Sequence, residues 1–139
     1  MMANSEPWIT LRRDYEASVQ TLSVPSKEVY LALVDDVIVG FIILIMQGAF
    51  IGYIQTVCVS PERRRMGFGR KLLEFAEERI LSDTPNVFIC VSSFNEYAQR
   101  AYRRLGYEVV GELQDYIVSG HPEILLRKAI APLNEFTKK

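Results

Sequence analysis

Residues 59–73 read VSPERRRMGFGRKLL, and they separate an apolar run from a segment with helical periodicity. Pro61 ends the apolar run, and the apolar residues after Gly67 recur at the spacing of three and four residues that is typical of a helix. Backbone N–H groups at a helix start lack intrahelical partners and carry partial positive charge, and glycine lets an anion approach the chain closely. The stretch therefore predicts a phosphate-binding turn, with small residues at Gly67 and Gly69 and charged donors from Arg64, Arg65 and Arg70.

Two common phosphate-binding loops do not fit this stretch. A Walker A loop requires Gly-Lys followed by Ser or Thr, whereas Gly69 is followed by Arg70 and Lys71. A dinucleotide-binding fingerprint requires a small residue where Leu72 stands. The sequence therefore argues against a nucleoside triphosphate or a nicotinamide dinucleotide as the ligand.

The patterns on both sides of this turn predict an α/β fold of the α+β type in a single domain over residues 1–139. The strand before the turn and the strand after its helix form a βαβ unit, whose strands should be parallel with a right-handed crossover. We therefore expect a mixed, mostly antiparallel sheet with a central parallel pair, flanked by helices. The predicted strands are residues 28–34, 37–46, 50–60, 87–91, 107–113 and 123–128, and the predicted helices are residues 10–22, 67–82 and 98–105.

The composition excludes several classes of function. Sixteen basic and seventeen acidic residues give a net charge of −1, so no overall field draws the protein to nucleic acid or to a membrane surface. The two cysteines, Cys58 and Cys90, have no metal-ligand spacing to each other or to His121, so we expect neither a disulfide nor a metal site.

The same reasoning addresses the location of the protein. Residues 37–54 are apolar enough for a membrane span, but Gln47 and Gly48 near their centre form a turn signal that favours two strands. The first residues lack the pattern of a secretory signal, so a cytoplasmic location is expected.

Two motifs resemble those of the GNAT superfamily of N-acetyltransferases. The first, V-x-P-x-x-R-x-x-G-x-G, runs from Val59 to Gly69. The second, N-x-x-A-x-x-x-Y-x-x-x-G-Y, runs from Asn95 to Tyr107. The motifs occur in the family's order with an apolar run between them, and the resemblance covers roughly residues 28–128.

The resemblance implies an acetyl-CoA-dependent N-acetyltransferase whose acceptor is an amine on a small molecule or a protein. The backbone of residues 65–70 would hold the pyrophosphate of coenzyme A, the backbone of residues 57–59 would line its pantetheine arm, and Asn95 would hydrogen-bond that arm. The residues implied in cofactor binding are Val57, Cys58, Val59, Arg64, Arg65, Met66, Gly67, Phe68, Gly69, Arg70 and Asn95.

The resemblance also places Tyr102 near the sulfur of the thioester. A phenol with a reference pKa of about 10 can give its proton to a departing thiolate, so Tyr102 is expected to be the general acid. A backbone N–H of residues 57–59 could stabilise the oxyanion. The base that deprotonates the amine stays open among Tyr53, Gln55, Asp115, His121 and Glu123.

Several questions stay open at this stage. The acceptor is undefined, and a non-catalytic acyl-CoA-binding sensor or regulatory module is the alternative function, because no base is assigned. The family usually opens with a strand that residues 5–22 do not resemble, so the domain is expected to be shortened at its N-terminus. The sheet edge exposed there is compatible with a homodimer.

Overall fold

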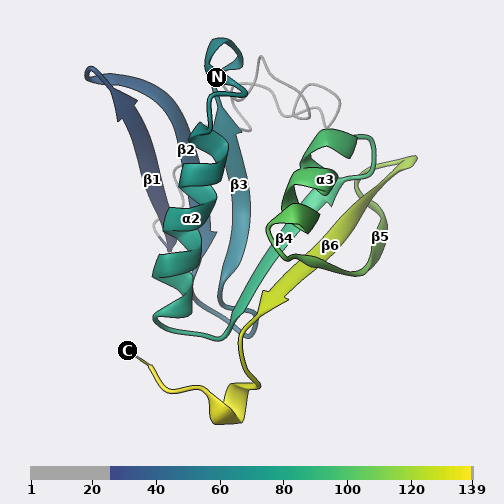
Figure 1. The fold of residues 1–139 in the computed structure, drawn as a ribbon. Coiled ribbons are helices and arrows are strands. Elements are labelled where there is room, and N and C mark those ends of the chain that lie inside the picture. Colours follow the sequence, from purple (N-terminus) through teal and green to yellow (C-terminus); the bar gives the residue numbers. More distant parts are fainter. Residues whose placement is uncertain (1–25, 139) are drawn as a thin grey trace.

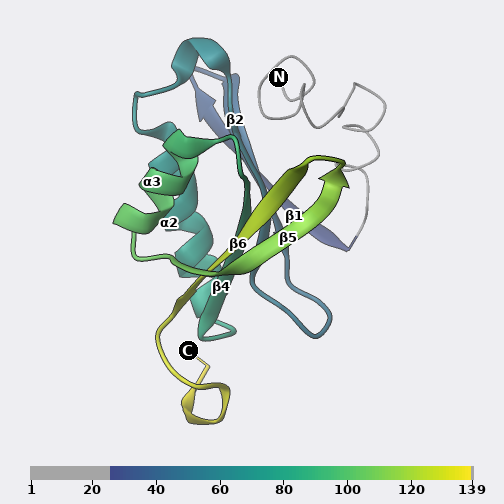
Figure 2. The same cartoon turned by 90° about the vertical axis from the view of Figure 1, so that its right-hand side faces the viewer.

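The computed structural model describes residues 26–138, which form one six-stranded sheet with two helices on one of its faces (Figures 1 and 2). The sheet has the order β1-β2-β3-β4-β6-β5. The strands are β1 (Lys27–Val34), β2 (Val37–Ile45), β3 (Tyr53–Val59), β4 (Asn86–Ser92), β5 (Glu108–Val118) and β6 (His121–Ala129). The helices are α2 (Phe68–Leu81) and α3 (Glu96–Arg104), with short 3₁₀ turns η1 (Pro61–Arg63) and η2 (Leu133–Glu135).

The first three strands form an antiparallel meander, as the sequence predicts. Asp35 and Asp36 both have positive φ and make the tight turn between β1 and β2. Gly40 lies where β2 approaches β3 most closely, because a Cβ there would stand 2.7 Å from the Cys58 carbonyl oxygen. The apolar stretch at residues 37–54 therefore belongs to two sheet strands, and within residues 26–138 no helix is long and apolar enough to cross a membrane.

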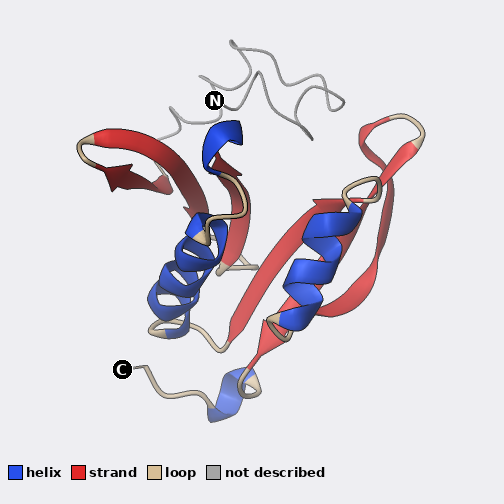
Figure 3. Ribbon diagram, turned by 45° about the horizontal axis from the view of Figure 1, so that its top comes forward, coloured by secondary structure: helices blue, strands red, loops and turns tan. Residues whose placement is uncertain are grey.

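Strands β3 and β4 are parallel and are joined through α2, so the predicted central βαβ unit is confirmed. Their ladder contains only two pairs, Tyr53 with Phe88 and Ile54 with Ile89. Beyond these pairs the strands diverge, as Figures 1 and 3 show, and we call the opening between residues 55–59 and residues 90–92 the β3–β4 wedge.

The core lies between the sheet and the helices. Helix α2 buries one stripe, formed by Leu72, Leu73, Ala76 and Ile80, against the same face of the central strands. The strand residues in this core include Ile54 of β3, Ile89 of β4 and Leu126 of β6. Since side chains alternate along a strand, their sequence neighbours face the other side of the sheet.

Two parts of the prediction need correction or fall outside the description. The last hairpin is longer than the predicted strands 107–113 and 123–128, because β5 continues to Val118 and β6 begins at His121. Its turn is closed by Asp115, whose φ is 51° and whose Oδ1 accepts a hydrogen bond from the Gly120 N–H at 2.7 Å. The third strand begins at Tyr53 rather than at residue 50. The predicted helix 10–22, and with it the question of a missing first strand, lies outside the described residues.

Candidate functional site

The turn between β3 and α2 has the backbone geometry of an anion site. Arg65 and Gly67 have φ angles of 63° and 86°, and left-handed residues in a turn are typical of backbone segments whose N–H groups bind anions. Helix α2 starts at Phe68 with no side-chain cap and no acidic residue in its first turn. Its leading amides therefore keep their positive character, and we call residues 65–70 the anion nest.

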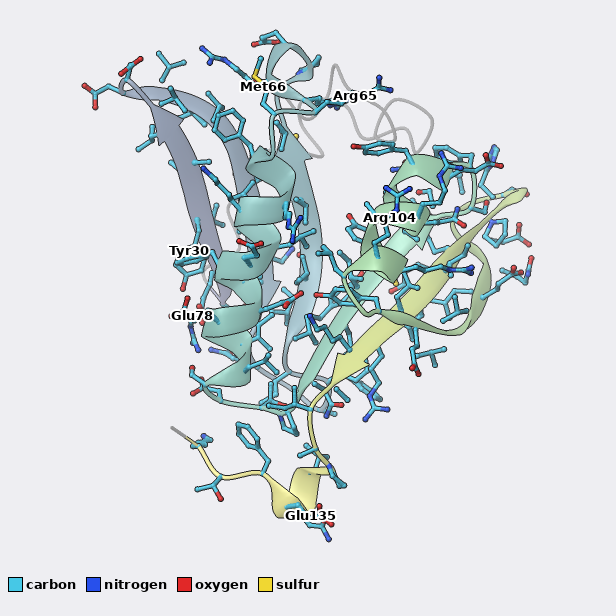
Figure 4. All side chains as sticks on the ribbon, viewed as in Figure 1. Tyr30, Arg65, Met66, Glu78, Arg104 and Glu135 are labelled. Atoms are coloured by element: carbon cyan, nitrogen blue, oxygen red, sulfur yellow. The ribbon has the colours of Figure 1, made fainter. Side chains whose placement is uncertain are left out.

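The arginines of this turn have partners that hold the nest in place. Arg64 Nε donates to the Val59 carbonyl oxygen at 3.2 Å, which ties the turn to the end of β3. The Arg65 guanidinium lies 5.7 Å from the centre of the Tyr97 ring on α3, and Figure 4 shows Arg65 and Met66 at the tip of the turn. Arg70 forms an exposed ion pair with Glu74 at 3.1 Å. Three arginines therefore lie at or next to the nest, and one of them, Arg70, is paired with a carboxylate.

The strand that leads to the nest has a β-bulge. Ile43 of β2 pairs with Thr56 and Leu44 pairs with Ile54, which leaves Gln55 without an opposite residue. The Gln55 Oε1 atom is buried and has no hydrogen-bond partner in the described part of the chain. A bulge next to a wedge with a buried, unsatisfied amide is an arrangement that a polar ligand could complete.

Beyond the bulge, β3 offers one unpaired backbone edge. Residues 57–59 pair with β2 on one side, and the β3–β4 ladder has already ended at Ile54 on the other. The edge of the β3–β4 wedge can therefore bind an extended chain of amides, in the way that a sheet edge binds an added strand. The predicted pantetheine-lining residues Val57, Cys58 and Val59 are the residues that form this edge.

The second motif lies on α3, which flanks the wedge on the helix side of the sheet. Asn95 Oδ1 accepts a hydrogen bond from the Ala98 N–H at 3.2 Å, so Asn95 is the N-cap of α3. Tyr102 packs against the core, and burial raises its pKa to about 12. Its hydroxyl therefore stays protonated at neutral pH and can donate a hydrogen bond.

A second polar group lies on the opposite face of the sheet. Tyr53, Cys90 and Ser92 alternate with core residues along β3 and β4, and Glu123 stands opposite Ser92 in the β4–β6 ladder. Burial raises the pKa of the Cys90 thiol, and hydrogen bonding with Tyr53 acts in the opposite direction. This group brings together two of the proposed bases, Tyr53 and Glu123, with Cys90 and Ser92, which the sequence reasoning did not single out.

Two of the other proposed bases, Asp115 and His121, lie in the β5–β6 hairpin. Asp115 closes its turn, and the His121 ring packs edge-on against Phe94 with centres 5.2 Å apart. Cys58 is buried, and this burial raises its pKa to about 11, so it is no nucleophile. Within residues 26–138 no group of three ligand side chains is placed to hold a metal ion.

Comparisons with known proteins agree with this geometry. The sequence model of the Acetyltransferase (GNAT) family matches residues 2–107. A segment of 60 residues, 42% of the chain, is 37% identical to the chloroplastic GCN5-related N-acetyltransferase 6 of Arabidopsis thaliana and covers 21% of that protein. A second curated relative is covered to 46%, so the chain spans less than half the length of the relatives that it matches by sequence.

Solved structures show the same fold at low sequence identity. The ribosomal-protein-S18-alanine N-acetyltransferase from Escherichia coli is similar with a TM-score of 0.73 and 17% identity, over 99% of this chain and 87% of that one. An aminoglycoside 6'-N-acetyltransferase complexed with coenzyme A is similar with a TM-score of 0.67 and 22% identity, over 83% and 79% of the two chains.

Proposed function

Because the chain belongs to the acetyltransferase (GNAT) family, we propose that it transfers an acetyl group from acetyl-CoA to a primary amine. The observation that carries the proposal is the position of the anion nest at the mouth of the β3–β4 wedge. If the diphosphate of coenzyme A bound at the nest, its extended arm would run along β3 into the wedge. The resolved coenzyme A in one structural relative supports this choice of donor.

The residues present fit the donor. The amides of residues 65–70 would hold the pyrophosphate, and the unpaired edge at residues 57–59 would pair with the amides of the pantetheine arm. The buried Gln55 oxygen is an acceptor that has no partner in the described structure. Acetyl-CoA would supply the activated carbonyl and the thiolate leaving group.

Tyr102 would act on the departing sulfur. Its pKa of about 12 keeps the hydroxyl protonated, so it can hydrogen-bond to the sulfur as negative charge develops there. The N–H groups at the edge of β3 are fixed in the sheet and need no reorganisation to stabilise the carbonyl oxygen. Direct transfer between donor and amine requires no nucleophile on the protein.

Release of free coenzyme A thiol from acetyl-CoA tests the proposal, with a mixed pool of diaminoalkanes, lysine and peptides with free N-termini as acceptors. A Gly67→Glu variant places a carboxylate in the anion nest and should abolish acetyl-CoA binding in calorimetry. Gly48→Glu is the matched control, because both glycines have positive φ and open space around the Cβ position.

The outcomes separate the two functions that the sequence left open. Amine-dependent release by the wild type that survives in Gly48→Glu and disappears in Gly67→Glu would support acetyl transfer at this site. Acetyl-CoA binding without release for any pool would favour a non-catalytic sensor. A wild type that does not bind acetyl-CoA would show that the proposal is wrong.

A further inference from the structure

Glu123 is a buried carboxylate on the sheet face that the donor-binding residues leave unused. Only 4% of its surface is exposed, and its Oε2 has no hydrogen-bond partner among the described residues. The two residues are direct partners in the β4–β6 ladder, so their side chains share one face of the sheet. A buried carboxylate oxygen without a partner is unfavourable unless a ligand supplies one.

Within residues 26–138, no lysine or arginine donates a hydrogen bond to the Oε2 of Glu123. Tyr53 of β3 and Cys90 of β4 lie on the same face of the sheet as Glu123. They interact electrostatically with each other and with the carboxylate, but neither side chain carries a positive charge. On its own strand, His121 lies two residues away on the same face with its ring edge-on against Phe94, and Arg127 donates to Asn86 Oδ1 at 2.8 Å. Burial accordingly raises the pKa of the Glu123 carboxyl, and the Ser92 hydroxyl opposes this rise.

The position of Glu123 relative to the wedge gives this carboxylate a use. Ser92 is the last residue of β4, and the β3–β4 wedge opens toward that end of the strand. Tyr102 lies on the helix side of the sheet, because it packs against the core cluster there. Ile124, the neighbour of Glu123, packs against the same cluster, so Glu123 faces the other side. Tyr102 and Glu123 thus lie on opposite faces of the sheet.

Resting on the function proposed above, we propose that Glu123 is the general base that takes a proton from the ammonium group of the acceptor. A cationic amine would supply the partner that the buried carboxylate lacks, so the acceptor class is a primary amine that is protonated in solution. The other proposed bases fit the role less well. Burial raises the pKa of the Tyr53 hydroxyl, Gln55 does not titrate, and Asp115 closes the hairpin turn. His121, with its ring edge-on against Phe94, is the competing base that the variants must separate from Glu123.

In the proposed step, one proton of the ammonium group moves to Glu123 on one face of the sheet, and a second moves to Tyr102 on the other face. The ammonium loses one proton to the Glu123 carboxylate, and the freed nitrogen lone pair forms the N–C bond as the C–S bond breaks. Tyr102 gives its proton to the sulfur and is reprotonated by the second proton of the nitrogen. Glu123 releases its proton to solvent, which leaves an amide, a thiol and one proton as products.

The test is the pH profile of kcat/KM with acetyl-CoA and the pool member that reacts fastest. We expect Glu123→Gln to lose at least about 100-fold in kcat/KM and to lose the acidic limb of the profile. The acetyl-CoA affinity of Glu123→Gln should stay within about twofold of the wild type, because Glu123 is not among the residues proposed to bind acetyl-CoA. Glu112→Gln is the matched control, since Glu112 is an exposed carboxylate on the neighbouring strand.

A second variant keeps the test valid if Glu123→Gln does not fold. The Ser92 hydroxyl lowers the pKa of Glu123, so Ser92→Ala should move the acidic limb to higher pH, while Ser93→Ala should leave it in place. Glu123→Gln with wild-type kcat/KM and an intact acidic limb would overturn the proposal, as would an unmoved limb in Ser92→Ala. If the wild type binds acetyl-CoA but acetylates nothing, the function proposed above fails, and that result is distinct from an active enzyme without dependence on Glu123.

Discussion

Gly52 sits at the closed end of the β3–β4 wedge, and replacing it with alanine tests whether this apex holds the two strands together. Its N–H donates to the Ile45 carbonyl oxygen at 3.0 Å, and its own carbonyl oxygen accepts from the Phe88 N–H at 2.9 Å. A Cβ at this position would stand 2.4 Å from the Asn86 carbonyl oxygen and 2.8 Å from Ile80 Cγ2. Contacts this short require the backbone of β4 or the end of α2 to move.

The expected cost has two parts. The φ angle of 92° lies in the region that disfavours L residues, which costs about 1–2 kcal/mol. The displaced backbone adds the cost of overpacking, about 1–3 kcal/mol. Together these make about 2–5 kcal/mol, a large part of a typical domain stability of about 5–15 kcal/mol. Acetyl-CoA affinity should fall as well, since the wedge would change shape.

Urea unfolding followed by circular dichroism measures this cost, and Gly48→Ala is the control. Gly48 has a similar φ angle of 94°, but a Cβ there would meet nothing within 4 Å. Gly48→Ala should therefore show the conformational part alone, about 1–2 kcal/mol. If Gly52→Ala destabilises the protein no more than Gly48→Ala, the apex does not depend on this close approach and the reasoning is refuted.

Three further predictions follow from the site. Tyr102→Phe should lower kcat by about 100-fold with little change in the KM for acetyl-CoA. Steady-state kinetics would measure this, with Tyr97→Phe as the control. The acid role would be contradicted if both variants matched the wild type. Asn95→Ala should cost about 1 kcal/mol in urea unfolding through the lost helix cap, whereas Asn95→Asp should keep most of it; equal losses would count against the cap. Glu123→Gln should be more stable than the wild type near neutral pH, because the raised pKa of Glu123 makes its ionised form unfavourable in the fold. Well below pH 4.5, the carboxyl is protonated in both the folded and the unfolded protein, so this advantage should vanish. Urea titrations at a series of pH values would show this.

Residues that end strands and helices explain why the order of elements could be predicted from the sequence. Pro61 ends β3, and Gly106, with a φ angle of 98°, follows the end of α3. The extended hairpin could not be predicted in the same way, because residues 114–118 lack a clean alternation of polar and apolar side chains. Their place in β5 depends on a turn that Asp115 closes through its side chain.

Some parts of the candidate site depend only on local sequence, and other parts depend on pairing between strands that are distant in the sequence. The anion nest could be predicted, because glycine spacing and helix periodicity are local features of residues 59–73. The sequence could not select Glu123 among the proposed bases, because its burial depends on the register that pairs it with Ser92 across β4 and β6. The unpaired edge of β3 likewise depends on a ladder that ends after two pairs.

The two faces of the sheet meet different chemical needs at one opening. Transfer of an acetyl group requires donors aimed at the leaving sulfur and the carbonyl oxygen, and an acceptor for the proton of the amine. A tyrosine that burial keeps protonated and a carboxylate whose pKa burial raises are suited to these opposite tasks. In the proposed reaction, the gap between the diverging strands β3 and β4 would let groups from both faces of the sheet reach the same reacting atoms, so the chemistry depends on a ladder that ends after two pairs.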